Sequence, residues 1–171
     1  MDKTIIVVTG HRPDKLGGYS EVAQDRVYSF AHKIFKRIRG FDHVITGMAL
    51  GWDTAVAQAC LDLKIPYHTY IPFVGQEKMW PQPSQAKYRH LVENAAKTVV
   101  VCSGDFAPWK MQDRNKAMVD RATYMIALWN GSTGGTKNCV TYARDKADNI
   151  RGIYNAWGEF EEFCGEKRIA A

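Results

Sequence analysis

Residues 4–9 read Thr-Ile-Ile-Val-Val-Thr, a continuous run of mostly β-branched side chains that ends at Gly10. β-branched residues favour extended backbone, and a run without polar alternation is typical of a strand buried on both faces of a parallel sheet. The segment that follows contains Pro13, Gly17 and Gly18, which are residues typical of a loop. Residues 4–9 therefore predict a buried strand of a parallel sheet.

A helix pattern follows this strand, because apolar residues between Val22 and Arg39 recur every three or four positions, from Val27 to Ile38. The strand and helix unit then repeats along the chain. Further strands are expected at residues 43–46, 67–71, 98–102, 124–129 and 150–154. Further helices are expected at residues 53–64, 84–95, 111–121, 136–146 and 159–164, the second of these with Ser84 as its N-cap.

This alternation predicts the α/β class, with a Rossmann-like, doubly wound, mostly parallel sheet that has helices on both faces. No linker and no shift in composition divides the chain, so we expect residues 1–171 to form a single domain. With 46% hydrophobic and 24% charged residues, the chain is an ordinary globular one, and neither disorder nor a fibrous repeat fits.

The composition also bears on location and partners. No apolar run reaches the ~20 residues that span a bilayer, so we expect no membrane contact. The four cysteines are far apart and lack the spacing of metal ligands, which predicts free thiols, a cytoplasmic protein and no bound metal. The net charge of +5 is spread along the chain and fits an anionic small molecule as well as nucleic acid.

Three predicted strand-to-helix loops carry residues that suit an anionic ligand: 9–13, 46–54 and 130–136. Ligands of parallel sheets bind beyond the carboxyl ends of the strands, where the strand order reverses. A glycine-rich turn before a helix presents free N–H groups and the positive end of the helix dipole, which suits a phosphate. The loops contain neither a G-x-G-x-x-G nor a G-x-x-x-x-G-K-[ST] motif, which disfavours a standard NAD site and a P-loop.

Individual side chains in these loops have two interpretations each. Arg12 is expected to bind phosphate through both guanidinium nitrogens, the alternative being a surface ion pair. His11 is either an acid–base group or a hydrogen-bonded loop residue. Asp53 is either the N-cap of its helix or an acceptor for ribose hydroxyls.

Several of these motifs, in this order, resemble the YpsA-like family of the SLOG superfamily, and more narrowly its phage-like YoqJ branch. The resemblance runs from about residue 4 to residue 147 and is carried by residues 9–13, 47–54, 80–81, 107–112, 114–115, 118–120, 134–136 and Asn138. The superfamily is Rossmann-like and includes the DNA-processing protein DprA, the LOG phosphoribohydrolases and nucleotide-signal sensors. The resemblance therefore implies a bacterial or phage-encoded protein that binds a nucleotide or a nucleotide derivative.

The chain departs from the LOG pattern at one position that matters for catalysis. LOG enzymes carry G-G-x-G-T-x-x-E, and the glutamate takes part in cleavage of the N-glycosidic bond. Here Cys139 stands three residues after Thr136, in the place of that glutamate. A thiol cannot replace a carboxylate at an oxocarbenium-like centre, so LOG catalysis is not carried over. Similarly, Gly51-Trp52-Asp53 resembles the Gly-Ile-Asp end of a DprA loop.

We therefore expect a cleft that binds a nucleotide derivative, such as an ADP-ribose-like molecule or a cyclic nucleotide, with no other cofactor. A hydrolase or transferase acting on a nucleotide N-glycosidic bond is the alternative, with Glu77 or Asp120 as its carboxylate. A DprA-like single-strand DNA binder, using Lys33, Lys36 and Arg37, is the third. A homo-oligomer is compatible with the sequence. The expected ligand-binding residues are Thr9, Gly10, His11, Arg12, Gly47, Met48, Ala49, Gly51, Asp53, Thr54, Trp80, Arg114, Asn115, Gly134, Gly135 and Thr136.

Overall fold

The computed structural model describes residues 2–170, and side chains for residues 2–167. Six strands form one sheet in the order β4-β3-β2-β1-β5-β6, and every neighbouring pair is parallel. The sheet is therefore wholly parallel, and the expected doubly wound α/β class is confirmed. The strands are β1 (Ile5–Gly10), β2 (His43–Thr46), β3 (Tyr67–Ile71), β4 (Lys97–Val100), β5 (Tyr124–Leu128) and β6 (Gly152–Asn155).

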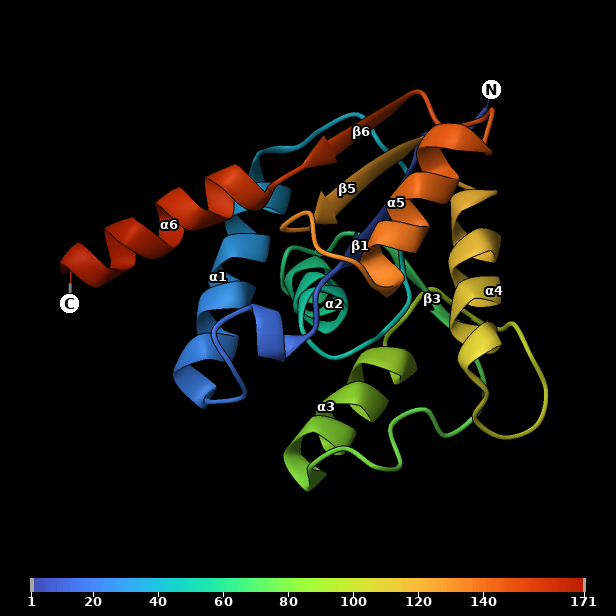
Figure 1. Ribbon diagram of the computed structural model, residues 1–171, viewed down its shortest axis with the longest axis horizontal. Coiled ribbons are helices and arrows are strands. Elements are labelled where there is room, and N and C mark those ends of the chain that lie inside the picture. The colour runs from blue at the N-terminus through green and yellow to red at the C-terminus, as the bar shows by residue number, and fades with distance from the viewer. Residues whose placement is uncertain (1, 171) are drawn as a thin grey trace.

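Helices connect these strands and cover both faces of the sheet. Figure 1 shows α1 and α6 on one side and α4 and α5 on the other. Among the described residues, no helix has both the length and the apolar composition needed to cross a bilayer. The helices are η1 (Pro13–Lys15), α1 (Glu21–Arg37), α2 (Trp52–Asp62), α3 (Gln82–Glu93), α4 (Pro108–Val119), α5 (Gly135–Asp145) and α6 (Trp157–Ala170).

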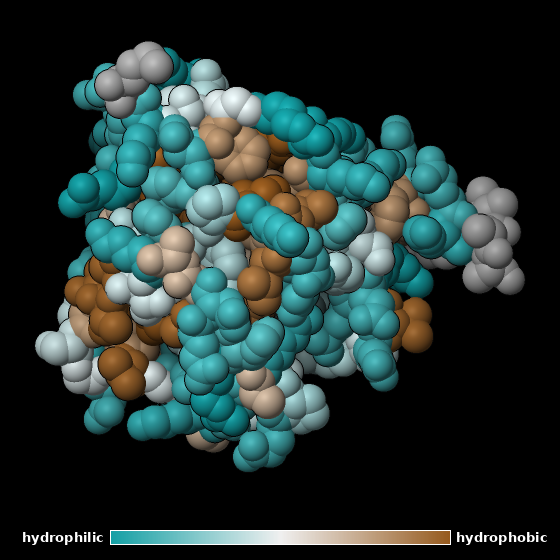
Figure 2. Space-filling model, turned by 180° about the vertical axis from the view of Figure 1, so that it is seen from behind, coloured by the Kyte–Doolittle hydropathy of each residue, from teal (hydrophilic) through white to brown (hydrophobic). Residues whose placement is uncertain are grey.

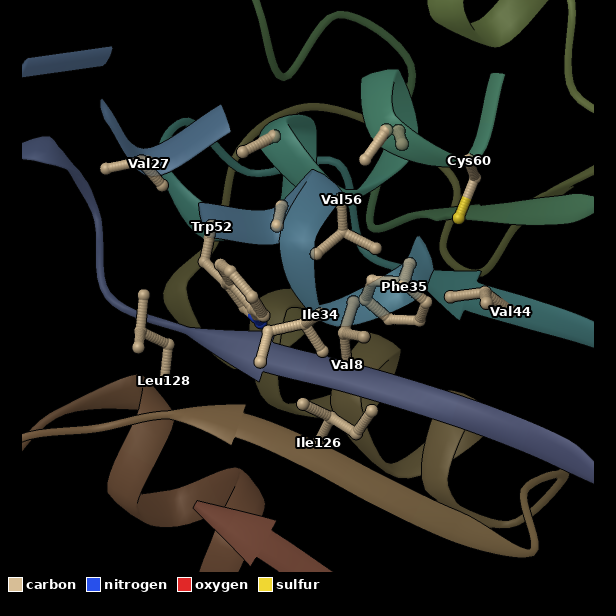
Figure 3. Packing of buried hydrophobic residues seen from close by; sticks show 14 of the residues in the cluster. Val8, Val27, Ile34, Phe35, Val44, Trp52, Val56, Cys60, Ile126 and Leu128 are labelled. Carbon is tan, nitrogen blue, oxygen red and sulfur yellow. The ribbon is translucent and has the colours of Figure 1, made fainter. Parts of the chain in front are cut away.

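The core explains why the first strand lacks polar alternation. Val8 faces the cluster formed with α1 and α2, where Ile34, Trp52 and Val56 pack together (Figure 3). Val7 faces the opposite cluster, which contains residues of α4 and α5. Both valines are fully buried. Because burying such a side chain contributes about 1.5–3 kcal/mol, both faces of β1 favour this register.

Several helices differ from the sequence prediction at their ends, and α4 covers Pro108–Val119 rather than the expected residues 111–121. Pro81 rather than Ser84 is the N-cap of α3, because Pro83 already lies in the first turn, where its φ is preset for a helix and its missing N–H leaves no partner unmet. The cap of α2 is Gly51 and not Asp53. The last helix extends over Trp157–Ala170, well beyond the expected residues 159–164. By contrast Ser20 caps α1 through a hydrogen bond from the N–H of Ala23, at 3.1 Å.

Large apolar side chains remain exposed along the β4 edge of the sheet, in the loops after β3 and β4, and at the start of α4. They are Val74, Met79, Val100, Phe106 and Trp109. Figure 2 shows the molecule from behind, with hydrophobic residues gathered in the middle and at the left of a largely hydrophilic face. Exposed apolar patches are typical of interaction surfaces, and the expected homo-oligomer stays a prediction.

Two histidines stack at the start of β2 and β3. The rings of His43 and His68 lie 3.8 Å apart, centroid to centroid. Burial, followed by the positive charges of His43, Lys97 and Lys3, lowers the pKa of His68 to about 4 from its ordinary value of 6.5. Burial also lowers the pKa of His43, with Lys3 adding to the effect and Asp42 opposing it. Below pH 6.5 the unfolded chain therefore binds protons that the folded chain refuses until about pH 4.

The free energy of unfolding should therefore fall as the pH drops from about 6.5 towards 4. We expect His68→Gln to lose less thermal stability between pH 7 and pH 5 than the parent, by roughly 2–4 °C, or about 1 kcal/mol after allowance for solvent screening. Thermal melting at both pH values measures this difference, with His90→Gln on the exposed face of α3 as the control. Equal losses in the parent and His68→Gln would show that the stacked pair does not titrate in this range.

Candidate functional site

A cleft of about 320 Å³ opens at the carboxyl edge of the sheet, where β1, β2 and β5 end. The strand order reverses between β1 and β5, which is where open α/β sheets bind their ligands. Segments from both faces of the sheet supply its walls. The lining residues are Thr9, Gly10, His11, Arg12, Asp14, Lys15, Ala49, Asp53, Met111, Arg114, Asn115, Thr133, Gly134, Gly135 and Thr136.

One wall of the cleft is the N-terminus of α5. Gly134 occupies the N-cap position with φ at +138°, a backbone conformation that favours glycine. A Cβ built on Gly134 or Gly135 meets nothing within 4 Å, so the space above this turn is open. The first backbone N–H groups of a helix have no partner within the helix. The turn therefore offers hydrogen-bond donors and the positive end of the helix dipole to an anion.

Two cationic residues flank this turn. Arg12 is exposed and lines the cleft. Lys15 donates a hydrogen bond from Nζ to Oγ of Ser132, at 2.8 Å, and contacts the carbonyl of Thr133 at 3.4 Å. Lys15 thus ties the loop after β1 to the loop after β5. Asp14 adds one negative charge to the same rim.

The loops after β1 and β2 interlock closely at the base of the cleft. A Cβ on Gly10 would lie 2.5 Å from the ring of Trp52, and one on Gly51 would lie 2.5 Å from the carbonyl oxygen of His11. Gly51 also has φ at +97°. The backbone N–H of Trp52 donates to that same carbonyl, at 3.2 Å. These two glycines therefore let the two loops pack as one rigid unit.

Asp53 is the most unusual acid of the cleft. It is buried in the first turn of α2, where Oδ2 accepts the N–H of Ala49 at 3.3 Å. Within the described residues, Oδ1 is buried and has no hydrogen-bond partner. Burial raises the pKa of Asp53 to about 6, although Arg114, the Ala49 N–H and Arg12 act in the opposite direction. Such an acceptor requires a partner from bound solvent or from a ligand.

Arg114 reaches the cleft from α4, where it is buried. Its Nε donates to Oδ1 of Asn115 at 2.9 Å, and its Nη1 donates to the carbonyl of Gly47. A Cβ on Gly47 would lie 2.6 Å from Nη1, so only a glycine leaves room for the guanidinium. Burial lowers the pKa of Arg114, and the attraction of Asp53 opposes this. Arg114 thereby joins the second loop to α4.

Met48, which follows Gly47 in the second loop, has a positive φ of +58°, which is rare for a residue with a side chain. It is fully buried in the core. Both Met48 and Gly47 offer their carbonyls to Nε2 of Gln76, at 3.5 and 3.4 Å. This turn of the second loop is therefore shaped by its neighbours and lies beneath the cleft.

His11 is a buried loop residue that lines the cleft. Its Nε2 lies 2.8 Å from Oδ1 of Asn130 and 3.0 Å from the backbone nitrogen of that residue. Its ring stands edge-to-face against Trp157, with centroids 5.8 Å apart. Burial lowers its pKa, so the imidazole is neutral near pH 7. These contacts make His11 a link between the loops after β1 and β5 and helix α6.

Several residues expected at the site lie elsewhere. Trp80 packs edge-to-face on Tyr88, with ring centroids 5.3 Å apart, and is not among the lining residues. Gly47, Met48, Gly51 and Thr54 also lie outside the lining. The first three shape its second loop, while the Thr54 hydroxyl donates to the carbonyl of Gly51 at 3.3 Å.

The expected catalytic carboxylates are not in the cleft either. Glu77 lies in the loop before α3, outside the lining, and its buried Oε2 has no hydrogen-bond partner among the described residues. Asp120 lies at the C-terminal end of α4, at the opposite edge of the sheet, where it accepts a hydrogen bond from the hydroxyl of Tyr142 at 2.7 Å. The negative charge of Asp120 is unfavourable at the C-terminal end of α4, and the hydrogen bond from Tyr142 explains why a carboxylate stands there.

Cys139 and the basic face of α1 also find structural explanations. Cys139 is buried in α5, and burial raises the pKa of its thiol to about 11, with the Thr9 hydroxyl acting against this. The thiol is thus neutral and shielded from solvent.

Arg37, at the end of α1, binds both carboxylate oxygens of Glu159 on α6, at 2.8 and 2.9 Å. The predicted basic face is therefore partly neutralised.

Four lining residues are not among those predicted from the sequence: Asp14, Lys15, Met111 and Thr133. Asp14 and Lys15 follow Arg12 directly in the sequence, and this proximity is the signal that could have identified them. Within residues 2–167, no cluster of three or more histidines, cysteines or acids forms that could hold a metal ion.

Comparison with known proteins places these features in one family. The family model described as the YspA SLOG family matches residues 6–156. The SPbeta prophage-derived protein YoqJ of Bacillus subtilis strain 168 is 32% identical over 117 residues, which cover 58% of this chain and 68% of YoqJ. The protein YpsA of the same organism is 21% identical over 154 residues, covering 83% of this chain and 84% of that protein.

Solved structures share the fold at low sequence identity. DprA from Streptococcus pneumoniae superposes with a TM-score of 0.60 at 14% identity, over 99% of this chain, which spans only 57% of that structure. DprA from Helicobacter pylori, described by its single-stranded DNA binding mode, gives 0.57 at 13% identity over 96% of this chain and 81% of that structure. TM1055 gives 0.54 at 15% identity over 96% and 99%. Since the family model covers most of its length, the chain belongs to the YspA SLOG family.

Proposed function

We propose that the cleft binds a nucleotide or a nucleotide-derived small molecule. The phosphate lies against the first turn of α5, and a sugar hydroxyl donates to Asp53. One observation carries the proposal: the unpartnered, buried Oδ1 of Asp53 belongs to the same cleft as the open turn at Gly134 and Gly135. An acceptor for hydroxyls and a set of donors for an anion are the two groups that a sugar phosphate needs.

The first experiment identifies small molecules that co-purify with the folded protein, by mass spectrometry after denaturation. Isothermal titration calorimetry with AMP, ADP-ribose and cyclic AMP then measures affinity. We expect at least one phosphorylated nucleoside to bind, and the corresponding unphosphorylated nucleoside to bind far more weakly. Failure of all these ligands, together with an empty mass spectrum, would refute the proposal.

The pH dependence of binding tests the role of Asp53. Since its pKa is about 6, the carboxylate is largely ionised at pH 7 and largely neutral at pH 5, so affinity for a hydroxyl donor should rise with pH across this range. We expect Asp53→Asn to weaken ADP-ribose binding roughly tenfold at pH 7 and to abolish this pH dependence. ADP-ribose is the suitable probe because it lacks the phosphate monoester that itself titrates near pH 6.

Asp14→Asn is the matched control, because it removes a second carboxylate from the rim of the same cleft. Its affinity should keep the parent's pH dependence. An unchanged pH profile in Asp53→Asn would exclude the carboxylate as the ligand's acceptor.

Hydrolysis or transfer at a nucleotide N-glycosidic bond is a second candidate function, favoured by the pKa of about 6 at Asp53. A carboxyl group near that value can hold or release a proton at neutral pH, as a general acid or base requires. Chromatography of nucleoside monophosphates incubated with the protein tests this function through release of free base. A rate that Asp53→Asn removes supports catalysis, and the absence of released base from every substrate excludes it.

A further inference from the structure

A second hollow, of about 420 Å³, lies between the loop after β1, helix α1 and helix α6. It is distinct from the cleft but adjoins it, because Lys15 lines both. The two are also joined by ring contact, since His11 of the cleft stands against Trp157 of the hollow. The hollow is lined by Lys15, Leu16, Gly17, Arg26, Trp157, Phe160, Glu161, Cys164 and Gly165.

Trp157 gives the hollow an aromatic surface in a fixed orientation. Its Nε1 donates to Oε1 of Glu161, one turn further along α6, and its ring packs on Phe160 with centroids 5.5 Å apart. The side chain is only partly buried. A partly exposed indole that is held from behind and at its edge leaves a surface on which a planar group can stack.

Arg26 supplies the second recognition element. Arg26 is a partly buried residue, and among the described residues its guanidinium has no hydrogen-bond or ion-pair partner, whereas Arg37 on the same helix pairs with Glu159. A guanidinium can stack on a planar base and donate to its ring nitrogens and carbonyls. Arg26, Lys15 and Trp157 thus combine positive charge with an aromatic surface, which is the chemistry that nucleotides require.

We infer that the ligand of this site is a dinucleotide joined through a diphosphate, with one nucleoside in the cleft and the second base in the hollow. This inference rests on the proposed function and extends it. Lys15, at the boundary, faces the bridging phosphates, and Trp157 and Arg26 hold the second base. The volume of the cleft is at the lower end of the roughly 300–1,000 Å³ of small-molecule sites, so one nucleotide occupies it and a second needs the hollow.

The test compares two probes that differ by one base. Diadenosine diphosphate carries the second adenine, whereas ADP-ribose has the same adenosine, diphosphate and second ribose without it. We expect diadenosine diphosphate to bind at least tenfold more tightly, since stacking and hydrogen bonding of the extra base strengthen only that complex. Calorimetry of both probes on the full chain measures the ratio.

Variants of the hollow test whether it causes the preference for diadenosine diphosphate over ADP-ribose. Arg26→Gln and Trp157→Leu should each reduce the tenfold preference towards unity, and Arg151→Gln should leave it unchanged. Arg151 is the matched control because it is an exposed arginine just before β6, at the opposite edge of the sheet. Trp157 contacts His11 and Phe160, so its variant is interpreted only if it melts like the parent. If it does not, Arg26→Gln alone decides the question, because that substitution removes no packed ring.

Four results would overturn the inference. Equal affinity for both probes means that the second base makes no contact, while ADP-ribose binding still upholds the proposed function. A preference that survives Arg26→Gln places the second base elsewhere. If Arg26→Gln loses affinity for a ten-residue oligothymidylate but binds diadenosine diphosphate like the parent, the hollow binds single-stranded DNA instead. If neither adenosine probe binds while AMP or cyclic AMP does, the dinucleotide inference fails and the proposed function stands.

Discussion

Replacing Gly135 with valine is expected to abolish nucleotide binding, with a loss of affinity of roughly 100-fold or more, while the protein remains fully folded. In the proposed complex the phosphate lies against the first turn of α5, so a branched side chain there would occupy its place. Losing about two charge-assisted hydrogen bonds accounts for that factor. Calorimetry with AMP and thermal melting of the same sample measure both effects.

The fold should tolerate the change, because a Cβ on Gly135 meets nothing within 4 Å and its φ is not in the left-handed region. Glycine is also the less favourable residue in a helix, so valine does not weaken α5. Gly158→Val is the matched control: it lies in the first turn of α6, and a Cβ there also meets nothing within 4 Å. Undiminished AMP binding in Gly135→Val would place the phosphate away from this turn.

The sheet was predictable from the sequence because each of its strands is a short run of apolar or β-branched residues between turn signals. The ends of all six strands lie within two residues of the expected ranges, and the largest differences are at the end of β4 and the start of β6. Helix ends were harder to place. Ser84 has the side chain of a good cap, but prolines at residues 81 and 83 start the helix earlier.

Part of the site could also be predicted, since loops that follow parallel strands meet at one edge. This rule brings residues 9–12 together with residues 134–136. Orientation could not be predicted in the same way. From its residue type and its loop, Trp80 was expected to stack on a base, yet its ring packs against Tyr88 on α3. The aromatic residue that adjoins the cleft is Trp157, on a helix whose start the sequence pattern placed two residues too late.

The pairing of Arg114 with Gly47 had no sequence signal at all. The two residues are 67 positions apart, and only the packing of α4 against the second loop brings them into contact. The same is true of Asp53, which looked like a helix cap because it stands near the start of α2. Burial, with its raised pKa and unpartnered oxygen, is a property of tertiary packing.

Replacing Arg114 with methionine is expected to lower the free energy of unfolding by about 3 kcal/mol, since it leaves neighbouring buried polar groups uncompensated. The carbonyl of Gly47 and Oδ1 of Asn115 each lose a donor. Asp53 loses the cation that acts most strongly against the effect of burial on its carboxyl group, so its pKa should rise further above 6. Urea denaturation at pH 7 measures the loss, and Arg121→Met, an exposed residue just after α4, is the control.

The double variant Asp53→Asn/Arg114→Met separates the charge effect from the packing effect. If Asp53 and Arg114 stabilise each other through space, the asparagine needs no compensating cation, and the double variant should lose less stability than the two single variants added together. A difference of about 1 kcal/mol is expected for coupled neighbours. Strict additivity would instead mean that Arg114 stabilises the fold only through its hydrogen bonds to Gly47 and Asn115. In that case burial, the Ala49 N–H and Arg12 determine the pKa of Asp53 without Arg114, and Arg114→Met should leave the pH dependence of ADP-ribose binding as it is in the parent.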